Sequence, residues 1–257
     1  MKNSLSLRTL LLAGVALVAG ASVASAEGIT VSINGGTSMT QMTAKEGYNE
    51  SVSNGIVTGL TGAYALSDMF SVELTAGYRF GYKYKGSNKE ASTNTPAVGV
   101  ETKGDVSSLS FIPAVRASYP VSMVKVYGLV GAGISMNSIS GAKVTDFSGD
   151  IDLHKINSAV PAGTKMAGTI TKGSFADATK NEFAYTLGAG VSYDVGSNFV
   201  VDLGYRFTDL GSFQPGAGKV TLNVPRANIK DKEVDAPAPD ARHPLAHEIA
   251  LTIGYRF

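Results

Sequence analysis

Eight stretches of the chain alternate between apolar residues and small or polar residues, and this period of two predicts β-strands. The clearest stretch is 69–82, where aliphatic and aromatic side chains share one face and Ser, Glu, Thr, Gly and Arg share the other. Pro113 lies inside another stretch and cannot donate to a ladder, so it predicts a bulge or a local break. The predicted strands span residues 28–38, 55–66, 69–82, 105–119, 122–137, 181–195, 199–210 and 246–257.

The connections between these strands alternate between long and short. That alternation is typical of an up-and-down barrel in an outer membrane, with short periplasmic turns and long extracellular loops. Structureless segments of this length would be unusual within a compact soluble domain. We therefore expect four mobile surface loops on one rim. The short turns lie at 67–68, near Pro120 and at 196–198, and the long polar segments at 39–54, 83–104, 138–180 and 211–245.

The residues on the two faces of the strands predict lipid outside and a polar lumen inside. A soluble eight-stranded carrier needs an apolar interior instead, and isolated charges in such a cavity would be costly without partners. Here one face carries large apolar residues, and the other carries small residues with isolated charges. We therefore predict an all-β fold, an eight-stranded antiparallel transmembrane up-and-down β-barrel. The predicted lumen charges are Glu73, Arg79, Arg116, Lys125, Asp202, Arg206, Glu248 and Arg256.

These charges have two interpretations: an ionic network that plugs the barrel, or a lining that selects permeating ions. Eight strands leave barely enough room for the side chains, so the plug is favoured. Strand heights place charges of opposite sign at the same level. The expected pairs are Glu73 with Arg116, Asp202 with Arg256, and Arg206 with Glu248.

The aromatic residues fall into two groups along the strands, as expected for the two girdles of a membrane barrel. The stretch from Phe70 to Phe80 spans roughly 25 Å at about 3.3 Å per residue and a tilt near 40°, which matches the apolar band. The tetrapeptide Gly-Tyr-Arg-Phe recurs at 77–80, 204–207 and 254–257. The first two copies lie toward the long loops and the last toward the periplasm, so they cannot form one site.

The first 26 residues have the pattern of a secretory signal peptide. Lys2 and Arg8 are followed by the apolar stretch 10–21 and by small residues that predict cleavage near Ala26. The expected domains are therefore a signal peptide, 1–26, and a barrel, 27–257. The absence of cysteine excludes disulfides, thiolate metal sites and a lipoprotein anchor. A net charge of +1 gives no indication of nucleic-acid binding.

Candidate chemistry is sparse. His243 and His247 could bind a metal, but solvated histidines are the preferred interpretation. An enzyme would need a base and a partner at the outer rim, and the proline-rich segment 211–245 is a poor support for them. The local candidates are Asp240, His243, His247 and Glu248. We expect no catalytic, cofactor or metal site. The glycine pairs at 131–133 and 188–190 indicate close packing rather than phosphate binding.

The pattern resembles the outer-membrane protein A-type and opacity-type eight-stranded barrels. It is most similar to the rickettsial surface-antigen family and related small porin-like proteins. The resemblance is carried by the signal peptide, by Val-Asp-Leu-Gly-Tyr-Arg-Phe at 201–207 and by Ile-Gly-Tyr-Arg-Phe at 253–257. It implies an outer-membrane location and a terminal strand, ending in Phe257, that resembles the signal read by the barrel-assembly machinery.

The same resemblance implies surface exposure and contact with host molecules. The expected function is a surface antigen or adhesion-type protein, with segments 83–104, 138–180 and 211–245 as the working surface because loops on a rigid scaffold carry function. A small porin or channel and a purely structural envelope barrel are the alternatives. The expected partners are outer-membrane lipid, the assembly machinery and host surface molecules, and the expected state is a monomer.

Overall fold

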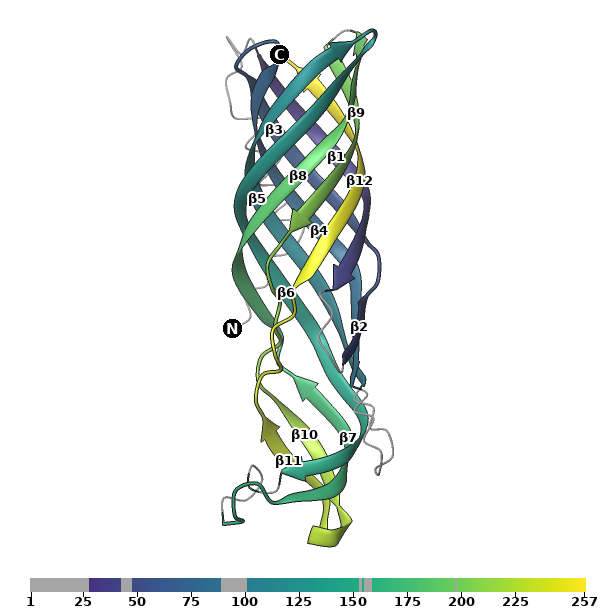
Figure 1. The fold of residues 1–257 in the computed structure, drawn as a ribbon, viewed down its shortest axis with the longest axis vertical. Helices are drawn as coiled ribbons and strands as arrows, with labels where there is room; N and C mark the ends of the chain where they lie inside the picture. The colour runs from purple at the N-terminus through teal and green to yellow at the C-terminus, as the bar shows by residue number, and fades with distance from the viewer. Residues whose placement is uncertain (1–27, 43–47, 89–100, 153, 155–158, 197) are drawn as a thin grey trace.

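Eight strands pair with their neighbours, all antiparallel, in the computed structural model, and β1 pairs with β12 to close the barrel (Figure 1). The structure describes residues 28–42, 48–88, 101–152, 154, 159–196 and 198–257. The expected signal peptide, 1–26, and part of the polar segment 83–104 lie outside these residues. The barrel strands are β1 (Ile29–Met42), β3 (Gly55–Ala65), β4 (Phe70–Asn88), β5 (Glu101–Val121), β6 (Val124–Asp152), β8 (Ala178–Gly196), β9 (Phe199–Asp209) and β12 (Pro244–Arg256).

The predicted all-β barrel is confirmed, and each of the eight predicted strands is found at its place. Their ends differ, because β4, β5 and β6 continue well past the predicted boundaries at the long-loop end. β6 alone has 29 residues. The barrel therefore has a short-turn end, where the strands are joined tightly, and a long-loop end from which three strands project.

The long segments hold more regular structure than the sequence predicted. They contain β2 (Tyr48–Val52), β7 (Lys165–Phe175), β10 (Gly218–Val224) and β11 (Ile229–Ala236), and a 3-10 helix, η2 (Pro225–Ala227). β7, β10 and β11 extend the sheet from β6, below the barrel in Figure 1. The prediction of mobile loops is wrong for these segments, because ladder hydrogen bonds and a shared apolar cluster order them.

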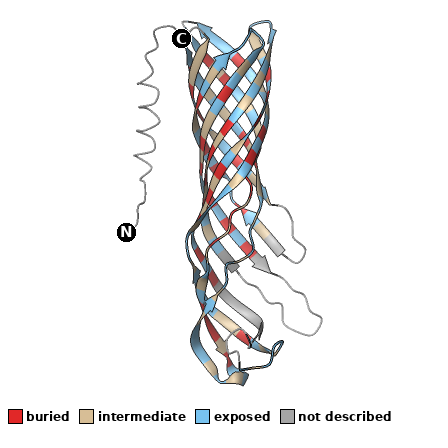
Figure 2. Cartoon of the chain, turned by 90° about the vertical axis from the view of Figure 1, so that its left-hand side faces the viewer, coloured by how far each residue is buried: buried red, intermediate tan, exposed pale blue. Residues whose placement is uncertain are grey.

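The alternation of faces follows the predicted pattern (Figure 2), except at Tyr82. The sequence places Tyr82 on the outer apolar face, but it is buried, because the irregularity between Arg79 and Tyr82 changes which residues face inward. On β1, Ile33 is 59% exposed on the outer face, whereas its neighbours Ser32 and Asn34 are buried in the lumen. The aromatic residues of both predicted girdles include members that are exposed on the outer surface, such as Phe70 and Phe183. Among the described residues, no helix is long and apolar enough to cross a membrane.

Pro113 interrupts one ladder only. It pairs with Leu74 on β4, whereas the described β5–β6 ladder has no pair at Ile112 or Pro113 and resumes in the same register at Ala114. The predicted local break is therefore present without a register shift. A register shift occurs instead between β4 and β5, where Gly81 has a φ of 83°, a conformation that favours glycine.

Candidate functional site

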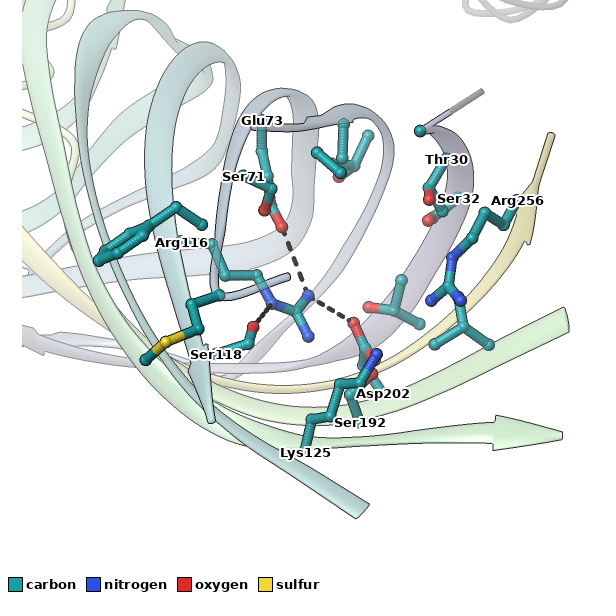
Figure 3. A pocket seen from close by; sticks show the side chains of 18 of the residues that line it. Thr30, Ser32, Ser71, Glu73, Arg116, Ser118, Lys125, Ser192, Asp202 and Arg256 are labelled. Atoms are coloured by element: carbon teal, nitrogen blue, oxygen red, sulfur yellow. Dashed lines mark hydrogen bonds and ion pairs between the residues drawn. The ribbon is translucent and has the colours of Figure 1, made fainter. Parts of the chain in front are cut away.

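The lumen opens into a polar cavity of about 270 Å³ at the short-turn end (Figure 3). We call this cavity the vestibule. Its lining includes the turn residues Ser67 and Asp68 and side chains from several strands. Small hydroxyl residues on its wall leave room for the cavity, and the longer charged side chains extend into it. The charged lining residues are Asp68, Glu73, Arg116, Lys125, Asp202, Arg206 and Arg256.

Arg116 is the centre of the ionic network in the vestibule. Its Nη1 donates to Asp202 Oδ2 at 2.8 Å and to Glu73 Oε1 at 3.4 Å, and its Nε donates to Ser118 Oγ at 3.3 Å. The guanidinium carbon lies 3.6 Å from the centroid of the Tyr127 ring, a cation–π contact. These ionic and cation–π contacts connect Arg116 on β5 to residues on three other strands, β4, β6 and β9.

A second ion pair lies deeper in the lumen. Arg79 donates from Nη2 to Glu248 Oε2 at 3.2 Å, makes a shorter contact from Nε to Glu248 Oε1, and donates from Nη1 to Ser110 Oγ at 2.8 Å. Both charged side chains are buried. The bidentate geometry suits burial, because it directs two guanidinium donors at both carboxylate oxygens. The neighbouring cavity is only about 20 Å³, roughly the size of one water.

The charge pairs are only partly those expected. Glu73 pairs with Arg116 as predicted. The predicted pairs Asp202–Arg256 and Arg206–Glu248 are wrong, because Asp202 and Glu248 bind arginines from other strands. Arg256 Nη2 lies 3.0 Å from Asp194 Oδ1, and Lys125 Nζ lies 3.4 Å from Asp194 Oδ2. The actual pairs are Arg116 with Glu73 and Asp202, Arg79 with Glu248, and Arg256 and Lys125 with Asp194.

An apolar cluster, which we call the outer plug, packs around the lumen axis at the long-loop end. Tyr84 and Phe213 meet edge to face, with ring centroids 5.5 Å apart. Phe213 comes from the proline-rich segment and is only 1% exposed. The sequence gives no signal for Phe213, because a single Phe without alternating neighbours does not indicate a strand. The outer plug consists of Val52, Tyr82, Tyr84, Val106, Ile139, Ala142 and Phe213.

Polar contacts fix the outer plug to the barrel. Asn137 donates from Nδ2 to the carbonyl oxygen of Leu210 at 2.6 Å. Arg242 forms an ion pair with Glu50, and the Tyr84 hydroxyl donates to Glu50 Oε1 at 2.9 Å. Burial raises the pKa of Tyr84 to about 12, so the phenol is neutral at physiological pH.

The residues considered for enzyme or metal chemistry are dispersed. His243 Nε2 lies 2.7 Å from Asp209 Oδ1, whereas His247 Nδ1 lies 2.6 Å from the Tyr205 hydroxyl, among the outer aromatic residues. Glu248 points the other way, into the lumen with Arg79. In the described part of the chain, no group of three or more His, Asp or Glu side chains could hold a metal ion.

Both glycine pairs bring backbones close together. A Cβ at Gly133 would collide with the carbonyl oxygen of Phe111, and one at Gly131 would lie 2.6 Å from that of Pro113. A Cβ at Gly190 would lie 2.5 Å from the carbonyl oxygen of Leu203. The prediction of close packing at these positions is therefore confirmed.

A closed eight-stranded barrel with an apolar outer face and an ionic lumen defines a transmembrane β-barrel of the outer membrane. Residues 10–257 match the outer membrane protein beta-barrel domain family, and the chain belongs to that family. It is therefore an outer-membrane protein, as expected. No curated protein matches the chain.

Similar solved structures have different functions. Neisserial surface protein A is 16% identical, with 91% of this chain and 99% of that chain covered and a TM-score of 0.43. The attachment invasion locus protein of Yersinia pestis, bound to the heparin analogue sucrose octasulfate, is 15% identical, with coverages of 90% and 99% and a TM-score of 0.39. The outer membrane protease of Escherichia coli is 12% identical, with coverages of 91% and 98% and a TM-score of 0.43. The barrel fold that these proteins share does not determine which of these functions a protein has.

Proposed function

We propose that this protein is a non-enzymatic surface protein that presents an ordered β-extension to the environment or to host molecules. The extension comprises β2, the outer parts of β4, β5 and β6, and β7, β10 and β11. In barrels of this type the long connections lie outside the cell. The observation that carries the proposal is that these connections form a sheet with its own apolar core.

That core makes the extension a platform rather than a set of loose loops. Val220, Leu222 and Val224 are buried at its centre. Burying one such aliphatic side chain is worth about 1.5–3 kcal/mol relative to leaving it exposed. The order supports a binding role, because a preorganised surface loses less conformational entropy when a partner binds. The partly buried residues around the centre are Val160, Met166, Ile170, Phe175, Ala227, Ile229, Val234 and Ala236.

Removing the outermost hairpin tests the proposal. A variant in which 218–236 is replaced by a short Gly-Ser linker keeps the eight barrel strands but loses β10 and β11. We expect binding of bacteria expressing it to host cells or matrix components to fall to the level of cells without the protein. Heat-modifiable electrophoretic mobility checks that the barrel is folded.

A matched control changes the opposite end of the barrel. Met123, in a short turn, is 76% exposed, so Met123→Gln should preserve both folding and binding. Binding that persists in the hairpin deletion with a folded barrel would reject the proposal. Loss of binding in both variants would indicate a general expression defect and would also count against the surface-protein proposal.

A small channel is the second candidate, and the vestibule is the observation that favours it. The Arg79–Glu248 pair and the outer plug argue against it, because they occupy the lumen at two successive levels. Single-channel recording distinguishes the two functions. The surface-protein proposal requires conductance near zero, and a steady open conductance would favour the channel.

The proposal also includes the partners expected from the sequence. The chain is secreted with residues 1–26 as a signal peptide, the barrel-assembly machinery recognises the strand that ends in Phe257, and the folded barrel is a monomer in lipid. Deletion of Phe257 should reduce insertion into the outer membrane more than Phe207→Ala does. Equal insertion of the two variants, measured by cell fractionation, would contradict the assembly role.

A further inference from the structure

Two residues of opposite charge lie where the vestibule meets the smaller cavity behind it. Glu73 on β4 and Arg206 on β9 are the two charged residues that line both cavities. In the part of the chain that the structure describes, no hydrogen bond or ion pair joins them. The space where the cavities meet is therefore bordered by a carboxylate and a guanidinium that do not bind each other.

The carboxylate of Glu73 is buried with little compensation. The residue is only 7% exposed. Its one hydrogen bond to a described residue comes from Arg116 Nη1, which lies 3.4 Å from Oε1 but 2.8 Å from Asp202 Oδ2 (Figure 3). Oε2 accepts no hydrogen bond from the described residues. Buried carboxylates usually have their oxygens satisfied by donors, so Glu73 retains the capacity to accept hydrogen bonds from a ligand.

Arg206 is half-buried and also retains unused donors. A guanidinium carries several N–H donors, yet Arg206 forms no hydrogen bond or ion pair with any described residue. Glu248, directly opposite on β12, is already bound to Arg79. Among the described lumen charges, Arg206 is therefore the cation left to bind a ligand. The basic lumen residues that do have a carboxylate partner are Arg79, Arg116, Lys125 and Arg256.

Small residues leave space beside both charges. Ala63 and Ala114 lie directly opposite Glu73 on the two adjacent strands. Gly188 lies directly opposite Arg206 on β8, and a Cβ there would be 3.2 Å from the Cγ of Arg206. The vestibule that opens from this point has a volume of about 270 Å³, far above the roughly 10–15 Å³ that one water molecule needs. It therefore has room for a small organic molecule.

The two charges together select a ligand that carries both signs. A simple anion attracted by Arg206 is repelled by Glu73, and a simple cation attracted by Glu73 is repelled by Arg206. A zwitterion satisfies both groups, because its carboxylate accepts from the guanidinium while its ammonium donates to the carboxylate. Both contacts are charge-assisted hydrogen bonds. An α-amino acid carries the two groups on a single carbon, and its binding adds no net charge to the lumen.

We propose that the vestibule binds a free α-amino acid as its zwitterion, with the ligand carboxylate at Arg206 and the ligand ammonium at Glu73. The short turns of such barrels face the periplasm, so the ligand enters from that side. The Arg79–Glu248 pair and the outer plug lie beyond the site, so the site holds its ligand and does not pass it to the exterior. The site is independent of the extension, which lies at the other end of the barrel.

Equilibrium dialysis of the folded protein in detergent micelles against radiolabelled glycine tests the site. We expect saturable binding to the wild type. Unlabelled glycine should displace the label at least roughly tenfold more effectively than acetate or methylammonium, because each of these lacks one of the two charge-assisted hydrogen bonds. Sodium chloride matches the ionic strength of all samples. This competition tests the need for both charges without any substitution in the protein.

Substitution of either charge should weaken glycine binding. We expect Glu73→Gln and Arg206→Gln each to lower the association constant at least roughly tenfold. The matched controls Asp105→Asn and Arg226→Gln change exposed residues outside the vestibule and should bind glycine as the wild type does. Heat-modifiable mobility checks that each variant is folded. The variant without 218–236 should also bind glycine, which separates this test from that of the extension.

Absence of saturable glycine binding to the wild type would overturn the proposal, and so would wild-type affinity in both vestibule variants. Acetate that competes as well as glycine, with a defect in Arg206→Gln alone, would assign the site to a simple anion. Methylammonium that competes as well, with a defect in Glu73→Gln alone, would assign it to a simple cation. Either of these results would also overturn the zwitterion site.

Discussion

At the scale of single residues, the lumen charges pair across the barrel as well as between neighbouring strands. Glu248 on β12 lies directly opposite Arg206 on β9, yet its carboxylate binds Arg79 from β4. The sequence predicts which face a charge occupies and roughly at what height. It does not predict the partner across the lumen, because that depends on how the barrel curves and how far each side chain reaches.

The buried Arg79–Glu248 pair should be costly to break. Glu248→Gln leaves a buried guanidinium without its counter-charge, and we expect a loss of about 3–5 kcal/mol in the free energy of unfolding. The measurement is urea-induced unfolding in lipid vesicles. The double variant Arg79→Met/Glu248→Leu removes both charges at similar volume and should be close to wild type. A double variant as unstable as the single one would show that the pair has another role.

Tyr84 should lose its phenolic proton at a higher pH than an ordinary tyrosine. Its pKa is raised from 10.0 to about 12, with burial as the largest cause. The fold therefore favours the neutral phenol, whose contribution to stability is complete below about pH 10 and is lost as the pH rises through about 12. Near-ultraviolet absorbance titrations of wild type and Tyr84→Phe should differ by one group with a midpoint near 12. A midpoint near 10 would mean that the outer plug is open to water.

At the scale of elements, close contacts between backbones shape the β5–β6 interface. Gly131 and Gly133 lie against the carbonyl oxygens of Pro113 and Phe111. The ladder loses its pairs at Ile112 and Pro113 there but keeps its register. The proline is tolerated because the glycines opposite allow the chains to pass closely.

A methyl group at Gly133 should disrupt this contact. Gly133→Ala would bring its Cβ into the carbonyl oxygen of Phe111, and we expect a loss of roughly 1–3 kcal/mol or more through overpacking. A Cβ at Gly62 would meet no other part of the chain within 4 Å, so Gly62→Ala serves as the control and should change stability by less than about 0.5 kcal/mol. Denaturant titrations of both folded variants compare them, and equal midpoints would refute the packing argument.

The sequence predicts the strands that cross the membrane but not the strands of the extension. The strands in lipid were predictable, because one apolar and one polar face alternate over their whole length. The strands of the extension were not recognised, although Val220, Leu222 and Val224 alternate with polar residues as in any strand. That run is short and lies between prolines and glycines. Its order depends on partners in β7 and β11, which are distant in the sequence.

At the scale of the whole molecule, the lumen is open at one end and obstructed at the other. The vestibule opens among the short turns. Along the lumen toward the long-loop end, the Arg79–Glu248 pair comes next and the outer plug after it. This arrangement fits a structural network better than a selectivity lining. The predicted plug of charges is thus complemented by an apolar one that the sequence did not reveal.

Conductance should therefore be low in the wild type and in a variant that disturbs the vestibule alone. Asp202→Ala removes the closer carboxylate from Arg116 and should lower the unfolding temperature in detergent without raising bilayer conductance. The combined variant Arg79→Ser/Glu248→Ser/Tyr84→Ala/Phe213→Ala, which clears both obstructions, should conduct. A large rise in conductance for Asp202→Ala alone would favour the selectivity lining.

β6 also gives the molecule a mechanical property. Its 29 residues run from the short-turn end into the extension, roughly 95 Å of continuous chain at about 3.3 Å per residue. A pull on the tip along this strand loads the hydrogen bonds to β5, β7 and β8 in shear, so many bonds must break together. Pulling across the strand would open them one at a time. Force spectroscopy with a handle at Gly163 should give a higher rupture force along the strand than across it, and equal forces would show that β6 does not carry the load.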